Sequence, residues 1–243
     1  MRLGAGLLVA GGVAGITAQE TEATPFAVAQ DKDKDAAKTV KPYVRPTPSE
    51  VLSDMVEGNA RFVRGEARQP RRTPKDFSAV AEGQRPRACV ITCADSRVTP
   101  EILFDQGIGD IFVVRIAGNA ISGSGAIVKG TIEYAVAELN VSLVMVLGHS
   151  GCGAIKAAIQ YVDSEEILPG SINELVDALK PAVTLARQKP GDLLENSIRA
   201  NVMRGVNRLR NLDPMVARGS KVGDIKVVGA VYTLKTGQVS IIG

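Results

Sequence analysis

Short, nearly continuous apolar runs alternate along the chain with longer stretches in which apolar residues recur at helical spacing. The apolar runs predict strands at residues 87–92, 111–115, 143–147 and 225–234. Helices are predicted at residues 126–139, 152–161, 172–188 with a kink at Pro181, and 193–212. Because buried strands that alternate with helices are typical of parallel sheets, we predict an α/β fold: a mostly parallel central β-sheet covered by helices. A hairpin at residues 236–238 then leads into a last strand at 239–242.

An N-terminal helical arm is predicted before the first strand. Thr47 is placed as the N-cap, Pro48 at the first helical position and Glu50 as the capping-box partner. Apolar residues then follow at helical spacing, which predicts a helix over residues 48–63. The ordered domain is therefore expected to span residues 47–243.

The first thirty residues differ in character from the rest. Arg2 precedes a glycine-rich apolar stretch at 3–16 that is too short for a membrane-spanning helix, and Ala27-Val28-Ala29 offers a small-residue cleavage site. We predict a signal peptide at 1–29, a disordered linker at 30–46 and export to the periplasm, with no stable membrane span. An uncleaved cytoplasmic extension is the alternative.

Composition excludes one class of partner. The chain has 243 residues, 45% of them hydrophobic, and a net charge of only +3. Basic residues cluster between positions 61 and 75, but they lie among prolines and lack the interleaved aromatic residues of a single-strand binder. We therefore predict no nucleic-acid binding, and interpret this segment as solvated or in contact with another subunit.

The single histidine and two of the three cysteines directly follow predicted strands or lie just beyond them. The single histidine, His149, follows the run at 143–147 and stands three positions before Cys152, while Cys93 follows the run at 87–92. Two thiolates and one imidazole are three protein ligands for zinc, and three leave the fourth position open, as in catalytic sites. The competing interpretation is that His149 caps a buried turn and that the cysteines are core residues. Cys89, inside the first strand, is predicted to be such a core residue.

Strand ends explain how these distant residues meet. Ligands bind at the carboxyl ends of parallel strands, and both Cys93 and His149 follow such ends. Cys152 opens a helix, whose macrodipole and free amides favour a thiolate. The glycines at 148, 151 and 153 also fit a phosphate-binding loop, but no Lys-Ser/Thr pair and no G-x-G-x-x-G pattern accompanies them.

Asp95 and Arg97 form an acid–base pair beside the first cysteine. Arg97 would keep the Asp95 carboxylate ionised and away from the metal, and Asp95 would accept a hydrogen bond from hydroxide and orient it. An ordinary surface salt bridge is the alternative. Their position two residues apart next to a metal ligand favours a catalytic role.

The segment from Cys93 to Arg97, followed by the segment from His149 to Gly153, resembles the β-class carbonic anhydrases. The similarity covers about residues 48–243 and includes 104–107, 113–119, 132–136 and 229–232. It implies reversible hydration of carbon dioxide to bicarbonate and a proton, by hydroxide on a zinc ion held by Cys93, His149 and Cys152. It also implies that Gln106 donates a hydrogen bond to bicarbonate, with a turn role beside Gly107 as the alternative. Gly153 is a further candidate for a substrate contact, through its backbone. A homodimer or homotetramer is implied as well, with the N-terminal helix packing on a neighbouring subunit.

Two departures from the family limit what is carried over. Some β-class members are closed by bicarbonate at a distal site that uses a tryptophan, and this chain has none. We therefore expect an open zinc site without that switch. With His149 bound to metal, no histidine is left as a proton shuttle. Hydrolysis of carbon disulfide or carbonyl sulfide, a carbon-dioxide-sensing or zinc-carrying protein, and a thiol redox protein remain the alternative functions.

Overall fold

The structure, a computed structural model, describes residues 44–243. The predicted signal peptide at 1–29 and all but the end of the predicted linker at 30–46 lie outside the described residues. Within the described part, no helix combines the length and the apolar composition that a bilayer crossing requires.

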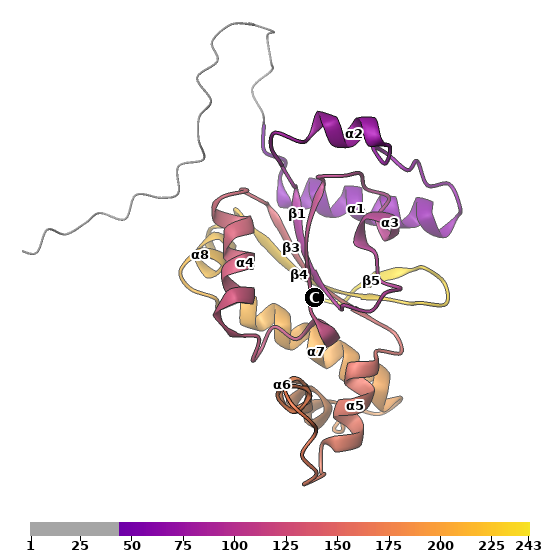
Figure 1. Cartoon of the computed structure of the whole chain (residues 1–243), viewed down its shortest axis with the longest axis vertical. Helices are drawn as coiled ribbons and strands as arrows, with labels where there is room; N and C mark the ends of the chain where they lie inside the picture. Colours follow the sequence, from indigo (N-terminus) through magenta and orange to yellow (C-terminus); the bar gives the residue numbers. More distant parts are fainter. Residues whose placement is uncertain (1–43) are drawn as a thin grey trace, which may run out of the picture. The chain divides into compact units, whose positions relative to one another are not determined.

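The centre of the described part is a sheet of five strands (Figure 1). The strand order is β2-β1-β3-β4-β5, with the first four parallel and β5 antiparallel to β4. The predicted mostly parallel α/β fold is therefore confirmed. The strands are β1 (Ala88–Thr92), β2 (Ile111–Arg115), β3 (Leu143–His149), β4 (Lys226–Tyr232) and β5 (Val239–Ile241).

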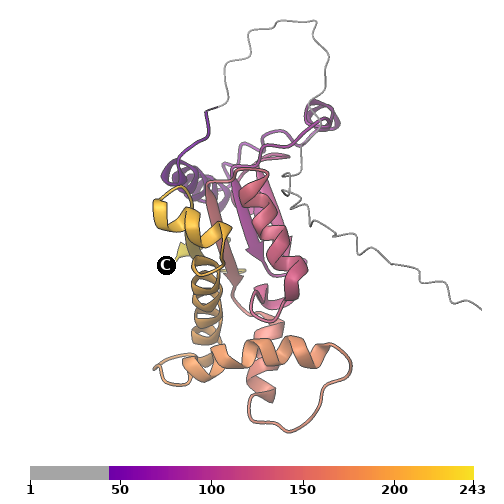
Figure 2. The ribbon, with the colours of Figure 1, turned by 90° about the vertical axis from the view of Figure 1, so that its left-hand side faces the viewer.

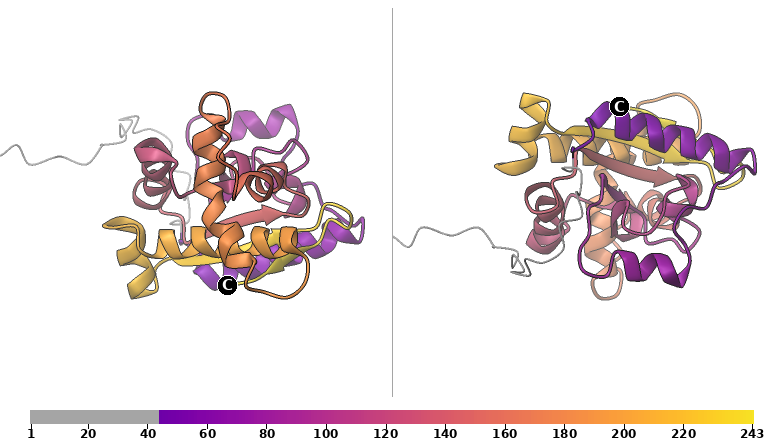
Figure 3. Two further views of the ribbon diagram at one scale, coloured as in Figure 1. Left: turned by 90° about the horizontal axis from the view of Figure 1, so that it is seen from below. Right: turned by 90° about the horizontal axis from the view of Figure 1, so that it is seen from above.

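Helices cover both faces of this sheet. One face packs against α1 (Pro48–Val63) and α3 (Pro100–Leu103), which contribute Met55 and Leu103 to the core on that side. The other face packs against α4 (Gly125–Ala137) and α7 (Leu193–Arg210). The helices α5 (Gly153–Tyr161), α6 (Ile172–Ala186) and α8 (Met215–Val222) extend the hydrophobic core on this side. Figure 2 shows α5 and α6 at one end of the sheet, beyond the carboxyl ends of the parallel strands. Seen along the strands, α6 crosses this end (Figure 3).

Side chains alternate between the two faces of each strand, and this alternation produces one hydrophobic core on each face of the sheet. In β1, Cys89 and Ile91 face the helices α4 to α8, whereas Ala88 and Val90 face α1 and α3. All five residues of β1 and all seven of β3 are buried, as the near-continuous apolar runs predict. β1 and β3 are thus packed on both faces, and their carboxyl ends hold the residues that follow them in place.

The N-terminal helix forms as predicted. Thr47 accepts a hydrogen bond from the Glu50 amide, and the Glu50 carboxylate accepts one from the Thr47 amide, which completes the capping box. Buried Val51 and Met55 pack the helix on its own sheet. Arg45, within the predicted linker, donates to the carbonyls of Val141 and Asp224 at 2.7 and 3.0 Å. The folded part therefore begins before the predicted boundary at residue 47.

Several element boundaries differ from the prediction. β3 extends through His149, because His149 pairs with Tyr232 of β4. The helix that contains Pro181 ends at Ala186 and the following one at Arg210, two residues earlier than expected for each. The short helices α2 (Pro74–Ala79), α3 and α8 and the 3-10 turn η1 (Ala117–Asn119) were not expected. Elements of three to eight residues contain too few apolar positions to show a period.

Candidate metal centre

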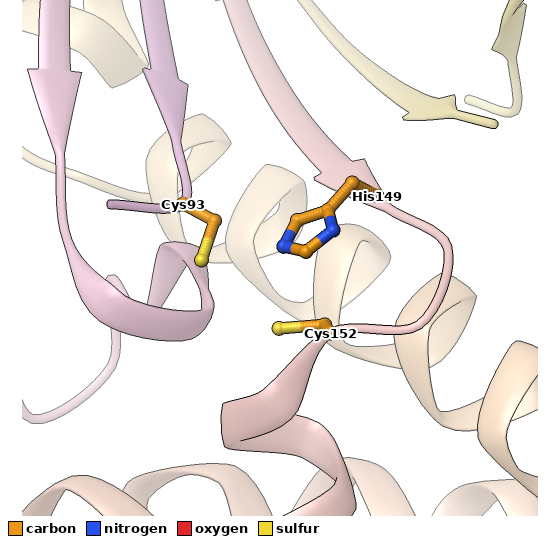
Figure 4. A group of neighbouring side chains, drawn as sticks. All are labelled: Cys93, His149 and Cys152. Atoms are coloured by element: carbon orange, nitrogen blue, oxygen red, sulfur yellow. The ribbon is translucent and has the colours of Figure 1, made fainter. Parts of the chain in front are cut away.

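Cys93, His149 and Cys152 lie at one end of the sheet. Cys93 directly follows β1, His149 is the last residue of β3, and Cys152 is the N-cap of α5. β1 and β3 are neighbours in register, with Thr92 opposite Leu147, so the chain positions just beyond them are also adjacent. Figure 4 shows the three side chains converging on one point from the two strand ends and the helix start.

The three potential ligand atoms form a compact group. They all lie within 4.8 Å of one another, and the exposed fractions of Cys93, His149 and Cys152 are 5%, 0% and 2%. Two sulfurs and one imidazole nitrogen at the ends of rigid elements match the donor set that zinc accepts in proteins. The structure therefore brings together all three predicted metal ligands.

The imidazole of His149 is oriented for binding through Nε2. Its Nδ1 lies 3.0 Å from the carbonyl oxygen of Ser150, which assigns the ring proton to Nδ1 and leaves Nε2 as the acceptor. Among the described residues, Nε2 is one of four buried side-chain nitrogen or oxygen atoms without a hydrogen-bond partner. A buried, unpartnered acceptor beside two thiols is costly in a protein interior, and a metal ion removes that cost.

Ser150 fixes the turn that carries the histidine. Its amide donates to the carbonyl of Tyr232 at 2.8 Å, and its hydroxyl accepts from the amide of Leu234 at 3.0 Å. Its own carbonyl is the partner of His149 Nδ1. This single residue therefore ties the metal-ligand turn to β4 and holds the imidazole.

The two thiols differ in how readily they lose a proton. The Cys152 thiol, as a hydrogen-bond donor to the Cys93 sulfur, lowers the pKa of Cys93 to about 4, against the opposing effect of burial. The amides of Asp95 and Gly118 also donate to that sulfur, at 3.4 and 3.2 Å. The pKa of Cys152 is raised, because its proton is shared with Cys93 and because it is buried. The pair thus gives up one proton readily and holds the second, which a dication would displace.

Cys89 has a different environment. It is 0% exposed, lies in the core on the α4 to α8 side of β1, and burial raises its pKa to about 12. A thiol with this pKa stays neutral and is neither a nucleophile nor a metal ligand. The prediction that Cys89 is a core residue is confirmed.

Asp95 and Arg97 form a two-point ion pair beside the cluster. Arg97 Nε donates to Asp95 Oδ1 at 2.9 Å and Nη2 donates to Oδ2 at 2.7 Å. These bonds hold the pKa of Asp95 far below its usual range. Asp95 Oδ2 lies 3.8 Å from His149 Nε2, so the carboxylate borders the metal-ligand group while Arg97 fixes it.

The other two predicted site residues lie differently. Gly153 is the first residue of α5, directly after Cys152, and its Cα faces open space. Gln106 is buried, donates to the carbonyl of Phe104 at 2.9 Å and accepts from Arg87 at 2.6 Å. Arg87 precedes β1, whereas Cys93 follows it, so Gln106 is held toward the opposite end of that strand. Its substrate-binding role stays a prediction.

Some residues that build the centre were not assigned a role from the sequence. Gly118 acts through its backbone, Ser150 through its backbone and hydroxyl, and Arg115 donates to the carbonyl of Asp95 at 2.7 Å. Asn201 of α7 donates to the carbonyl of Gly118 at 2.8 Å. These contacts either join residues 20 or more positions apart in the sequence or use backbone atoms. A local sequence motif therefore does not reveal them.

Comparisons with known proteins identify the family. The family model described as Carbonic anhydrase matches residues 88–239. A curated protein from Mycolicibacterium smegmatis, named Carbonic anhydrase, is 39% identical over 76% of this chain and 88% of its own length.

Solved structures give the class. The β-carbonic anhydrase CcaA has a TM-score of 0.64 at 27% identity, covering 79% of this chain and 95% of that one. One of two tetrameric β-carbonic anhydrases from Sordaria macrospora has a TM-score of 0.62 at 26% identity, covering 80% and 98%. With a mostly parallel sheet and a Cys-His-Cys centre at its carboxyl end, this chain belongs to the β-class of the carbonic anhydrase family.

Proposed function

We propose that this protein is a zinc-dependent carbonic anhydrase (carbonate dehydratase) that catalyses the reversible hydration of carbon dioxide to bicarbonate and a proton. The observation that carries the proposal is the convergence of Cys93 Sγ, His149 and Cys152 Sγ within 4.8 Å at the carboxyl ends of β1 and β3. Family membership supplies the substrate class.

Cys93, His149 Nε2 and Cys152 would hold the zinc ion. When bound by three protein ligands, zinc supplies Lewis acidity that lowers the pKa of water from 15.7 to about 7 at a fourth, open position. Both thiols would bind as thiolates, and the N–H of His149 Nδ1 toward Ser150 keeps Nε2 available. The net charge of two thiolates and a neutral imidazole balances a dication.

Asp95 would orient the attacking oxygen. Arg97 binds both carboxylate oxygens, so Asp95 stays ionised and serves only as a hydrogen-bond acceptor. Because Asp95 Oδ2 lies 3.8 Å from His149 Nε2, the carboxylate is close enough to accept a hydrogen bond from a water or hydroxide held beside the ligands. The same Arg97 contacts would keep the carboxylate from turning toward a bound metal ion.

Gln106 and Gly153 are proposed substrate contacts. Gly153 lies next to Cys152 on α5 and presents no side chain that would obstruct the site. Gln106 is bound to Arg87, toward the opposite end of β1 from Cys93. A substrate contact from Gln106 therefore requires a second copy of the chain, which agrees with the proposed homodimer or homotetramer. Size-exclusion chromatography with light scattering measures that state, and a monomer with full activity would remove Gln106 from the substrate site.

The decisive experiment combines kinetics with metal analysis on the full chain. We expect stopped-flow carbon dioxide hydration together with one zinc per chain. Cys152→Ser should lose both zinc and activity, because one thiolate ligand is replaced by a hydroxyl. Cys89→Ala is the matched control and should keep both, because the Cys89 thiol contributes only to the core.

Full activity in preparations without zinc would refute the proposal. Zinc binding without carbon dioxide hydration would instead favour the zinc-carrying or sensing alternative.

A further inference from the structure

We propose that Asn201, on the buried face of α7, is a positioning residue that tunes the Cys93 thiolate through Gly118. The inference rests on the proposed zinc site. It gives α7, which supplies none of the zinc ligands, a role in positioning one of them. Asn201 is 5% exposed, and its Nδ2 donates to the carbonyl oxygen of Gly118 at 2.8 Å.

Gly118 is held from both sides. Its carbonyl accepts from Asn201, and its amide donates to Cys93 Sγ at 3.2 Å. A hydrogen bond from a side chain 83 positions away in sequence thus fixes the orientation of the peptide group next to the one that reaches the sulfur. If the Gly118 carbonyl loses this partner, the turn can rotate, and the direction of the Gly118 amide changes with it.

The turn around Gly118 leaves little room for another arrangement. Gly118 has a φ of +64°, and a Cβ on it would lie 2.9 Å from Leu179 and 3.1 Å from Ala154. An L-residue is therefore disfavoured by the backbone conformation and obstructed by packing. Glycine at this position and the hydrogen bond from α7 together hold the turn in which the amide faces the sulfur.

The same face of α7 also supports the histidine. A Cβ on Gly148, the residue before His149, would lie 2.7 Å from Val202 and 3.3 Å from Ile198. Residues 198, 201 and 202 are three and four positions apart and thus share one helix face. This face therefore contacts η1, whose Gly118 amide donates to Cys93 Sγ, and the end of β3, which carries His149.

Hydrogen bonds to a coordinating sulfur withdraw electron density from it. Fewer such bonds make the thiolate a stronger electron donor, and more make the metal more electrophilic. Cys93 Sγ receives amide bonds from Asp95 and Gly118, and the Gly118 bond is the shorter of the two. Asn201 therefore acts on the metal through a peptide amide without touching it.

Cobalt(II) substitution gives the direct test. The intense thiolate-to-cobalt charge-transfer absorption reports the donor strength of the sulfurs. In Asn201→Leu, similar in volume but without a donor, we expect this band to move to lower energy. We also expect zinc affinity, measured by chelator competition, to fall by about 10- to 100-fold, because the Cys93 sulfur is no longer held in its binding geometry and this loss outweighs its stronger electron donation. Asn201→Asp, which keeps the shape and removes the donor, is the second variant in case the leucine variant does not fold.

Val206→Ala is the control on the same helix. Val206 is 0% exposed, so the variant destabilises α7 packing, but Val206 is not a partner of Gly118. It should lower the melting temperature without moving the charge-transfer band. If both Asn201 variants fold, melt at lower temperature and keep the wild-type band and zinc affinity, Asn201 is merely structural and the inference is wrong. Absence of the band in the wild-type protein would instead refute the proposed metal site.

Discussion

Asp95 is the residue at which structure and proposed chemistry meet most closely. Its carboxylate accepts from both Arg97 Nε and Arg97 Nη2, and its Oδ2 borders His149 Nε2 at 3.8 Å. An ordinary surface ion pair contributes about 0–1 kcal/mol to stability, so a contribution to stability hardly accounts for this pair. A charged acceptor fixed beside a metal-ligand group has a clear catalytic use.

Replacing Asp95 by Asn tests that use. The amide keeps the shape but places an NH2 donor where an acceptor is needed, so we expect kcat to fall by about 100-fold or more while zinc content stays unchanged. Asp163→Asn is the matched control, since Asp163 forms an equivalent exposed ion pair with Arg187 away from the ligands. Stopped-flow kinetics and metal analysis of both variants decide the matter. Parental rates in Asp95→Asn would exclude the carboxylate from the mechanism.

Individual residues differ in how visible their roles are in the sequence. Cys93, His149 and Cys152 were predictable because strand ends in a parallel sheet determine where the following residues lie. The position of Gln106 was not, because it depends on a loop whose contact with Arg87 has no periodic signature. Asn201 was also not predictable, because an asparagine within an amphipathic helix gives no indication of what its side chain binds.

At the scale of elements, α1 and α3 are packed through a glycine. A Cβ on Gly58 would lie 1.9 Å from the carbonyl oxygen of Phe104, the C-cap of α3. Gly58→Ala gains up to about 1 kcal/mol of helix propensity, but the overlap with backbone forces α1 away from the sheet. We expect a net loss of about 1–3 kcal/mol in the free energy of unfolding, as for other overpacked cores.

Gly130 in α4 is the control for Gly58. No atom lies within 4 Å of a Cβ built there, so Gly130→Ala should raise stability by up to about 1 kcal/mol. Urea denaturation of the two variants measures both effects. Equal shifts in the same direction would show that helix propensity dominates and that the α1–α3 contact can relax.

The connection between α1 and α2 depends on one buried carboxylate. Asp105 accepts from Arg61 Nε at 2.8 Å and from the amides of Arg68 and Gln69 at 2.9 Å each. Burial raises the pKa of Asp105, but these hydrogen bonds outweigh it, and the net pKa is lowered. Arg61, Arg71 and Arg72 of the basic segment thus pair with Asp105 or Asp110 of their own chain, and the prediction of a solvated or subunit-contacting segment stays a prediction.

Asp105 gives the protein a defined acid sensitivity. A lowered folded-state pKa means that its stabilisation is fully present above the unfolded value of about 3.9 and is lost as pH falls through the folded value. Asp105→Ala leaves Arg61 and two amides without their partner, and we expect a loss of about 3–5 kcal/mol at pH 7. Melting temperatures from pH 2 to 7 should converge for variant and parent at the acid end. Parallel curves would show that Asp105 does not titrate in this range.

Prediction of the elements succeeded where periodicity was long. The helix at Pro48–Val63 was predicted with its bounds, because a capping box and a proline mark its start and apolar residues repeat along it. The length of β3 was underestimated, because glycine and histidine end an apolar run in sequence while pairing with β4 continues in space. Long-range pairing of this kind is set by the neighbouring strand and not by the local sequence.

For the whole molecule, the environment of the cysteines bears on whether the protein can be exported to an oxidising compartment. In an oxidising compartment unpaired thiols tend to form disulfides, yet two of the three cysteines here would be bound to metal and the third is fully buried. All three are free cysteines in the described part of the chain. This arrangement is compatible with export, because a bound zinc ion would protect Cys93 and Cys152 and burial protects Cys89.

We propose that the chain is exported to the periplasm and cleaved after Ala29, because Arg2 and the apolar stretch at 3–16 precede a small-residue site. Cell fractionation with mass spectrometry should find a protein that begins at Gln30 in the periplasmic fraction. Leu8→Arg interrupts the apolar stretch and should retain the uncleaved chain in the cytoplasm, whereas Thr21→Arg, outside that stretch, should still be exported. An uncleaved wild-type chain in the cytoplasm would assign residues 1–29 to a cytoplasmic extension and leave the zinc site, which depends on residues 93–152, unaffected.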